Sequence, residues 1–178
     1  MPTRRSKTKS DSVPGMRKRF VAVVGARRSG KSTTIQSASG CATHRFHGFV
    51  QDFSNRHSLY VIAASPQETG LTAADFQRIL NLILRTPLAQ GLIAAIQPSQ
   101  PTRRLRMEQM LDMARQSGFE TFAFVLDPPR QRRNLQSFDE IRERILQADP
   151  VAQVVRLDGR RFAVLNAEAI RAISRVPF

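Results

Sequence analysis

The sequence contains no tryptophan, one tyrosine, one cysteine and no long hydrophobic run. Because Cys41 is the only cysteine, neither an intramolecular disulfide nor a cysteine-based metal site can form, which suits a reducing compartment. No apolar run approaches the roughly 20 residues needed to cross a bilayer, and no apolar stretch follows the basic N-terminus as in a secretory signal. These absences predict a cytoplasmic protein without membrane association.

Acidic residues are also scarce. The chain has 14 Asp and Glu against 28 Lys and Arg, which gives a net charge of +14. Seven basic residues and one acidic residue lie within residues 1–20, so the rest of the chain is basic as well. Such a field attracts polyanions, and we expect nucleic acid (RNA or DNA) or a nucleoprotein as a partner. For residues 1–12 taken alone, a solubilising tail is an equal alternative.

What remains is enough for one folded domain. Residues 1–17 are polar, basic and without period, and are expected to form a disordered arm, whereas 18–178 is the length of a single domain. Short apolar runs alternate with amphipathic stretches, which predicts an α/β fold with a mostly parallel sheet. The expected strands are 20–24, 46–53, 59–64, 92–96, 121–126, 151–157 and 161–165, and the expected helices are 32–38, 72–85, 103–117, 137–146 and 166–173.

Local signals define several element ends. Residues 46–64 predict one hairpin, and residues 151–165 predict a second one around Asp158-Gly159. Thr72 and Ser137 each have an acidic residue three positions later, the pattern of a capping box, and Asn166 is expected to cap the last helix.

One motif carries specific chemistry. The segment from Gly25 to Ser32 fits G-x-x-x-x-G-K-[ST] and lies between a predicted buried strand and a predicted helix, the context that this motif requires. Its glycines permit a sharp turn whose backbone N–H groups face phosphate oxygens. Lys31 is expected to reach the β- and γ-phosphates, and the Ser32 hydroxyl to ligate Mg²⁺. The nucleotide-binding residues predicted here are Gly25, Ala26, Arg27, Arg28, Ser29, Gly30, Lys31, Ser32 and Thr33.

A bound Mg²⁺ needs an acidic partner at the end of a neighbouring strand. Asp52 and Asp127 both close predicted strands, and either one equally suits a turn. Just beyond Asp127, the guanidinium groups of Arg130, Arg132 and Arg133 are candidates for clamping a transferring phosphate or a nucleic-acid backbone; a solvated basic loop is the alternative.

Through this motif the chain resembles the P-loop NTPase superfamily, which implies a three-layer α/β domain that binds ATP or GTP with Mg²⁺. Residues 76–146 are most similar to the polynucleotide-kinase and zeta-toxin-like kinases, in the order helix, strand, helix with a basic start, strand ending near Asp-x-Pro, and arginine-bearing segment. The resemblance implies a kinase-like NTPase or phosphotransferase that acts on or alongside nucleic acid. Lys31, Asp127 or Asp52, and Arg130, Arg132 and Arg133 would then be its catalytic residues.

A second likeness leads to a different class of function. The segment from Tyr60 to Glu68 is similar to the part of small GTPases that contains a water-positioning glutamine, which Gln67 would match. Ala63 and Gln97 stand where acidic residues are found in the two families. The alternative to an enzyme is therefore a nucleotide-gated, weakly hydrolysing binding module or assembly factor that docks on a nucleoprotein complex.

Overall fold

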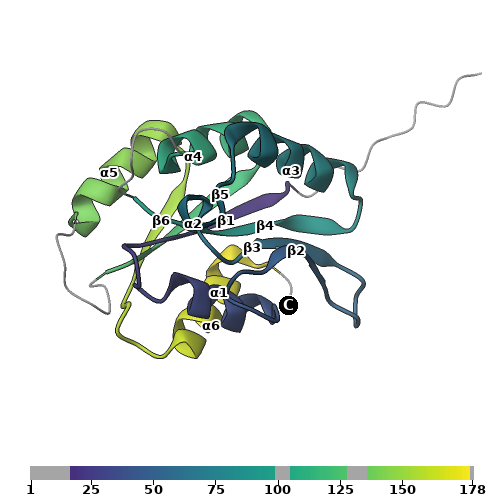
Figure 1. Ribbon diagram of the computed structural model, residues 1–178, viewed down its shortest axis with the longest axis horizontal. Helices are drawn as coiled ribbons and strands as arrows, with labels where there is room; N and C mark the ends of the chain where they lie inside the picture. The colour runs from purple at the N-terminus through teal and green to yellow at the C-terminus, as the bar shows by residue number, and fades with distance from the viewer. Residues whose placement is uncertain (1–16, 99–104, 128–135, 177–178) are drawn as a thin grey trace, which may run out of the picture.

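The computed structural model describes residues 17–98, 105–127 and 136–176. They form an α/β fold around a six-stranded, mostly parallel sheet with strand order β2-β3-β4-β1-β5-β6 (Figure 1). The strands are β1 (Arg19–Val24), β2 (His47–Gln51), β3 (Ser58–Ile62), β4 (Ala89–Ile96), β5 (Glu120–Leu126) and β6 (Gln153–Leu157). All neighbouring strands are parallel except β2, which is antiparallel to β3. The fold class predicted from the sequence, an α/β domain with a mostly parallel sheet, is confirmed.

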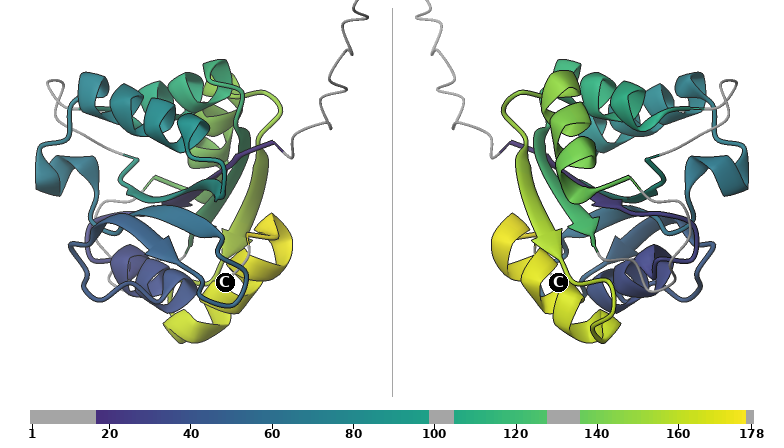
Figure 2. Two further views of the ribbon diagram at one scale, coloured as in Figure 1. Left: turned by 90° about the vertical axis from the view of Figure 1, so that its right-hand side faces the viewer. Right: turned by 90° about the vertical axis from the view of Figure 1, so that its left-hand side faces the viewer.

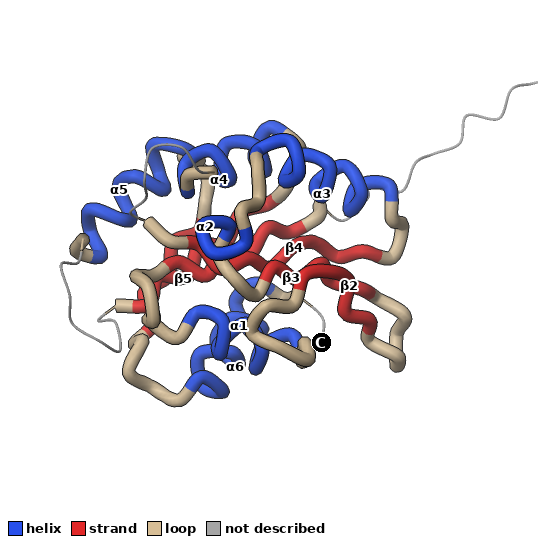
Figure 3. The backbone as a smooth tube through the Cα atoms, viewed as in Figure 1, coloured by secondary structure: helices blue, strands red, loops and turns tan. Residues whose placement is uncertain are grey.

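Helices cover both faces of the sheet, as the tube in Figure 3 and the turned views in Figure 2 show. One face carries α3 (Ala73–Arg85), α4 (Met107–Gln116) and α5 (Phe138–Ala148), and the other carries α1 (Lys31–Ser39) and α6 (Ala163–Ser174). A short helix, α2 (Pro66–Thr69), follows β3 and was not predicted from the sequence.

Strand β1 lies at the centre of both hydrophobic cores. Its residues from Phe20 to Val24 are completely buried, because β4 and β5 flank it and helices cover both of its faces. Side chains alternate between the faces of a strand, so Phe20, Ala22 and Val24 join the core under α3, α4 and α5. Val21 and Val23 join the core under α1 and α6.

The helix starts follow local chemistry. The Thr72 hydroxyl accepts a hydrogen bond from the Asp75 amide at 3.1 Å, and the Ser137 hydroxyl accepts one from the Glu140 amide at 3.2 Å. In both cases the acidic side chain returns a bond to the backbone N–H of the capping residue, so both predicted capping boxes are confirmed.

The predicted C-terminal hairpin is wrong. Residues 153–157 form β6, which pairs in parallel with β5, and residues 163–174 are helical. The Asp158 carboxylate accepts a hydrogen bond from the Arg160 amide at 2.9 Å, which closes a local turn from a strand into a helix. Asn166 is not a cap either: it lies inside α6, where its side-chain amide donates to the Asp158 carbonyl at 3.0 Å.

None of the helices within the described ranges is long and apolar enough to cross a membrane. Residues 1–16, which make up nearly all of the predicted arm, lie outside the described residues, as do Arg103 and Arg104 at the predicted start of the fourth helix.

A side chain near the C-terminal end of α6 donates hydrogen bonds to the C-terminal end of α1. Arg171 of α6 donates from Nε to the Ala38 carbonyl at 3.1 Å and from a terminal nitrogen to the Ser37 carbonyl. These carbonyls belong to the last turn of α1, where a cation also meets the negative end of the helix dipole.

We therefore expect Arg171→Leu to lower the free energy of unfolding by about 1 to 3 kcal/mol, because it leaves two partly buried carbonyls without a donor. Urea unfolding measures the change. Arg142→Leu, on the exposed surface of α5, is the matched control and should stay within about 0.5 kcal/mol of the wild type. An equal loss in both variants would contradict the assigned role of Arg171.

Candidate phosphate-binding site

The segment from Gly25 to Ser32, called here the 25–32 loop, leaves the end of the central strand β1 and enters α1. The edge of the sheet where β1, β3, β4, β5 and β6 end is called the carboxyl edge; it lies toward the left in Figure 1. The Gly25 amide donates to the Ile96 carbonyl at 3.1 Å, which ties the start of the loop to the end of β4. Ligands of open, mostly parallel sheets bind at this edge, where neighbouring connections turn to opposite faces.

The loop is compact and is stabilised by its own backbone. The Ser29 amide donates to the Ala26 carbonyl at 3.2 Å, and the Thr34 amide donates to the Gly30 carbonyl at 2.9 Å. Gly30 has φ 93°, a left-handed conformation that strains any residue with a Cβ. A Cβ on Gly25 would lie 2.5 Å from the Ser29 hydroxyl oxygen, so the glycine is needed for space as well. Both fixed glycines of the motif thus have a physical reason.

The N-terminus of α1 has no side-chain cap. Gly30 is the N-cap residue, it offers no side-chain hydrogen bond, and no acidic residue lies in the first turn. The first backbone N–H groups of a helix have no partner within the helix, and they carry the positive end of its dipole. Among the side chains next to these groups, Ser32 is partly buried and Thr33 is exposed. This end of α1 can therefore accept an anion.

Lys31 lies against the same loop. Its side chain is 6% exposed, and its ammonium group donates to the Ala26 carbonyl at 2.7 Å. Burial lowers the pKa of Lys31 from 10.5 to about 8, and the negative charge of Glu68 partly offsets this by raising it. A buried amine at an uncapped helix N-terminus gains from a nearby anion, which would keep it protonated.

One hydroxyl inside the loop has no partner. Ser29 is 1% exposed, and its oxygen makes no hydrogen bond within the described part of the chain. Burying an unpaired hydroxyl costs free energy, so a polar group from a ligand or water would stabilise it. The two arginines of the loop, Arg27 and Arg28, are exposed, and Arg28 has φ 61°.

The structure separates the two candidate acids. Asp127 directly follows β5, the strand beside β1, and therefore lies at the carboxyl edge. Its carboxylate is 2.7 Å from Arg156 on β6, and the Arg156 guanidinium lies 5.6 Å from the centre of the Phe138 ring. Asp127 is thus near the 25–32 loop but is already engaged in an ion pair.

Asp52 lies at the opposite edge of the sheet. It follows β2, and because β2 is antiparallel to β3, the turn that contains Asp52 is at the start of β3. This hairpin turn is on the right in Figure 1, away from the end of β1. The Asp52 carboxylate accepts hydrogen bonds from the amide and the hydroxyl of Ser54, as a turn residue does. The structure does not bring Asp52 together with Lys31 and Ser32.

The other predicted catalytic residues, Arg130, Arg132 and Arg133, lie outside the described residues. Within the described ranges, no group of three or more His, Cys, Asp or Glu side chains could hold a metal ion.

Sequence reasoning missed Glu68 as a site residue. It belongs to α2, which follows β3, and its charge acts on Lys31 although the two residues are far apart in the sequence. Ser65, at the start of this helix, is 1% exposed, and its hydroxyl has no hydrogen-bond partner among the described residues. The sequence signal was Ser65-Pro66, a helix N-cap followed by proline at the first helical position.

Comparisons with known proteins add little to this geometry. No family profile matches the chain, and no curated protein matches it. Among solved structures, an unliganded sugar kinase from Janibacter sp. HTCC2649 is similar with a TM-score of 0.43 and 15% sequence identity, covering 87% of this chain and 93% of that one. At this level of similarity nothing about the site is carried over.

The arrangement predicts a measurable titration. In the protein without nucleotide we expect Lys31 to titrate near pH 8, and Glu68→Gln to lower its pKa further, because a charge that raises it is removed. NMR of ¹³C-labelled lysine suits the measurement, since the chain has four lysines, Lys7, Lys9, Lys18 and Lys31.

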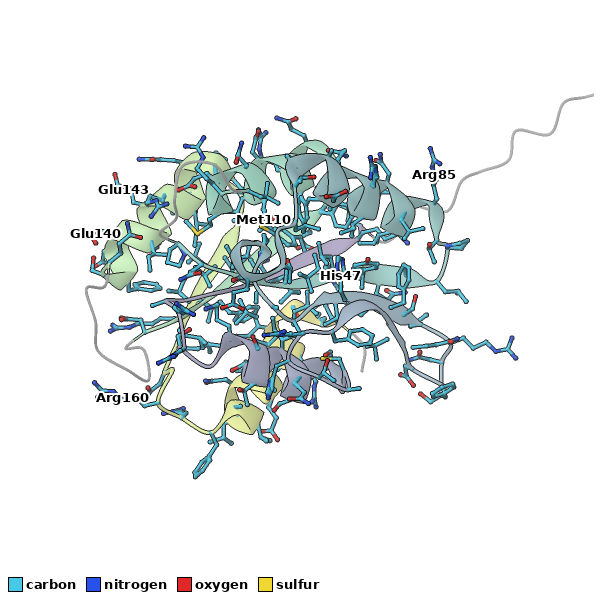
Figure 4. The ribbon with its side chains drawn as sticks, viewed as in Figure 1. His47, Arg85, Met110, Glu140, Glu143 and Arg160 are labelled. Carbon is cyan, nitrogen blue, oxygen red and sulfur yellow. The ribbon has the colours of Figure 1, made fainter. Side chains whose placement is uncertain are left out.

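Glu143→Gln is the control, because Glu143 lies on the outer surface of α5, away from the loop (Figure 4). This substitution should leave the Lys31 titration unchanged. A Lys31 signal that titrates above about pH 10, as an exposed lysine does, would show that the side chain is not buried against the loop.

Proposed function

We propose that this chain is a Mg²⁺-dependent P-loop protein that binds a nucleoside triphosphate, ATP or GTP, at the 25–32 loop. The observation that carries the proposal is the uncapped N-terminus of α1 with the buried Lys31 beside it, at the end of the central strand. The helices on both faces of a mostly parallel sheet fit the three-layer domain of the P-loop NTPases.

In this function the loop amides and Lys31 bind the β- and γ-phosphates. Lys31 would exchange the Ala26 carbonyl for phosphate oxygens, and the unpaired Ser29 hydroxyl would gain a polar partner. The Ser32 hydroxyl, partly buried in the first turn of α1, would be a Mg²⁺ ligand, and the ion would neutralise charge on the phosphates. Arg27 and Arg28 make no ion pair within the described residues, and both are exposed to solvent.

The kinase-like interpretation extends this site to phosphoryl transfer. Charge that spreads over a transferring phosphoryl group would be stabilised by Lys31 and the loop amides, and by the arginines that the sequence predicts for this role, Arg130, Arg132 and Arg133. The second candidate, a nucleotide-gated binding module, is favoured by the ion pair of Asp127 with Arg156, which occupies the acid that follows β5 at the carboxyl edge. Multiple-turnover release of phosphate, or its transfer to an acceptor, would support the enzyme. Nucleotide-dependent association without turnover would support the module.

The central experiment is triphosphate binding by Lys31→Ala. The substitution removes the cation that compensates the phosphates, so affinity for Mg²⁺-ATP or Mg²⁺-GTP should fall at least about tenfold, or about 1.4 kcal/mol. Isothermal titration calorimetry measures it. Arg85→Ala removes the same charge at the opposite end of the sheet (Figure 4) and should bind like the wild type. Equal affinity in all the proteins would refute the proposal.

Association with nucleic acid is the second part of the proposal. Besides the net charge of +14, exposed arginines lie in two connections at the carboxyl edge: Arg27 and Arg28 on the 25–32 loop, and Arg160 and Arg161 in the turn between β6 and α6. A backbone phosphate bound at this edge would lie on the same side of the sheet as the triphosphate.

We expect binding to RNA or DNA to weaken steeply with salt, because each neutralised phosphate releases counterions. Deleting residues 2–17 should flatten the slope of log affinity against log salt without abolishing binding, since the folded part remains basic. Fluorescence anisotropy over a salt series measures both effects. The absence of any binding at low salt would exclude this partner.

A further inference from the structure

The acidic side chains in the connections at the carboxyl edge differ in the hydrogen bonds and ion pairs that they form. Three described acids lie in the connections that follow strands there: Glu68 after β3, Asp127 after β5 and Asp158 after β6. Asp127 is paired with Arg156, and Asp158 accepts a bond from the Arg160 amide and lies 3.9 Å from Arg161. The carboxylate of Glu68 makes no hydrogen bond or ion pair within the described residues. Among these three acids, Glu68 is the one that can bind a cation without first losing an existing ion pair or hydrogen bond.

The backbone holds Glu68 in place. The Ser65 carbonyl accepts hydrogen bonds from the Glu68 amide at 2.8 Å and the Thr69 amide at 3.2 Å, and the Gly70 amide closes the helix by donating to the Pro66 carbonyl at 2.8 Å. Ser65 and Pro66 are buried, so α2 is attached to the domain while the Glu68 side chain stays exposed. Because the backbone of this turn is already ordered, only the side chain of Glu68 loses conformational freedom when it binds.

This turn lies on the same side of the sheet as the 25–32 loop. Strand β3 is parallel to β4 and β4 is parallel to β1, so the connections that follow β3 and β1 leave from the same edge. The negative charge of Glu68 also raises the pKa of Lys31, in keeping with a carboxylate on the same edge as the 25–32 loop. Each of the two connections also contains a buried hydroxyl without a hydrogen-bond partner among the described residues, Ser29 on one and Ser65 on the other.

We propose that Glu68 is the carboxylate that, together with the Ser32 hydroxyl, would hold the Mg²⁺ of a bound triphosphate, directly or through a water. This deepens the proposed function and rests on it. It replaces Asp52, which lies at the other edge of the sheet, and Asp127, whose charge is used by Arg156. One carboxylate, one hydroxyl, phosphate oxygens and waters make up a common Mg²⁺ site.

We expect the charge of Glu68 to have opposite effects on triphosphate binding with and without Mg²⁺. At a pH well below 8, where Lys31 is protonated in both proteins, the negative charge of Glu68 repels the triphosphate in the absence of Mg²⁺, so removing this charge leaves binding unchanged or makes it tighter. With Mg²⁺, the same charge attracts the bound cation, so removing it weakens binding. A carboxylate that merely orients Lys31 would instead affect both conditions alike.

The test is calorimetry of the full chain with ATP and with GTP, once in excess Mg²⁺ and once in EDTA. In the wild type, Mg²⁺ should tighten binding of one nucleotide at least about tenfold. In Glu68→Gln this gain should fall below about threefold, while binding in EDTA is equal to or tighter than that of the wild type. Glu143→Gln, an exposed glutamate on α5, should retain the wild-type gain. Unliganded thermal melts of each variant confirm that it is folded.

Each of the following results would overturn the inference. A wild-type Mg²⁺ gain in Glu68→Gln would remove Glu68 from the metal site, and a loss of that gain in Asp127→Asn would assign the role to Asp127. Equal weakening of Glu68→Gln in Mg²⁺ and in EDTA would show an effect on Lys31 rather than on the metal. If the wild type itself binds neither nucleotide, the proposed function fails, and that failure is visible before any variant is compared.

Discussion

The arrangement of the site depends on the burial of β1. A strand covered on both faces and paired on both sides has no polar groups left for water, so its backbone partners must come from β4 and β5. The register runs without interruption from Arg19 to Val24 on both sides. The chain can turn only where this ladder ends, and that point is Gly25, whose amide still bonds to the end of β4. The 25–32 loop is thereby held between a rigid strand and α1.

Local patterns were sufficient for most of the fold. The apolar runs of β1, β4 and β5, the two capping boxes and the β2–β3 hairpin are all encoded by residues that are close in the sequence, and the structure confirms them. The predicted C-terminal hairpin was wrong because it was based on a local turn signal alone. Asp158-Gly159 is a good turn pair, but whether a turn joins two strands or a strand and a helix depends on what packs behind it. Here α6 packs against α1, and β6 completes the edge beside β5.

The site was less predictable because it depends on strand direction and strand order. From the sequence, Asp52 and Asp127 look alike, since each closes an apolar run. The structure places them at opposite edges, because β2 alone runs against the other strands. Glu68 shows the converse. No motif distinguishes it, and its relation to Lys31 arises from parallel strands that are not neighbours in the sheet, with β4 lying between β3 and β1.

The 25–32 loop gathers positive charge without internal compensation. Arg27, Arg28 and Lys31 surround a helix N-terminus that already carries a positive partial charge, and the first turn of α1 contains no acid. Part of the unfavourable energy is avoided because burial lowers the pKa of Lys31, so that its amine loses a proton more easily than an exposed lysine does. The charge of Glu68 works in the other direction and keeps the amine protonated. A bound anion would supply the missing compensation.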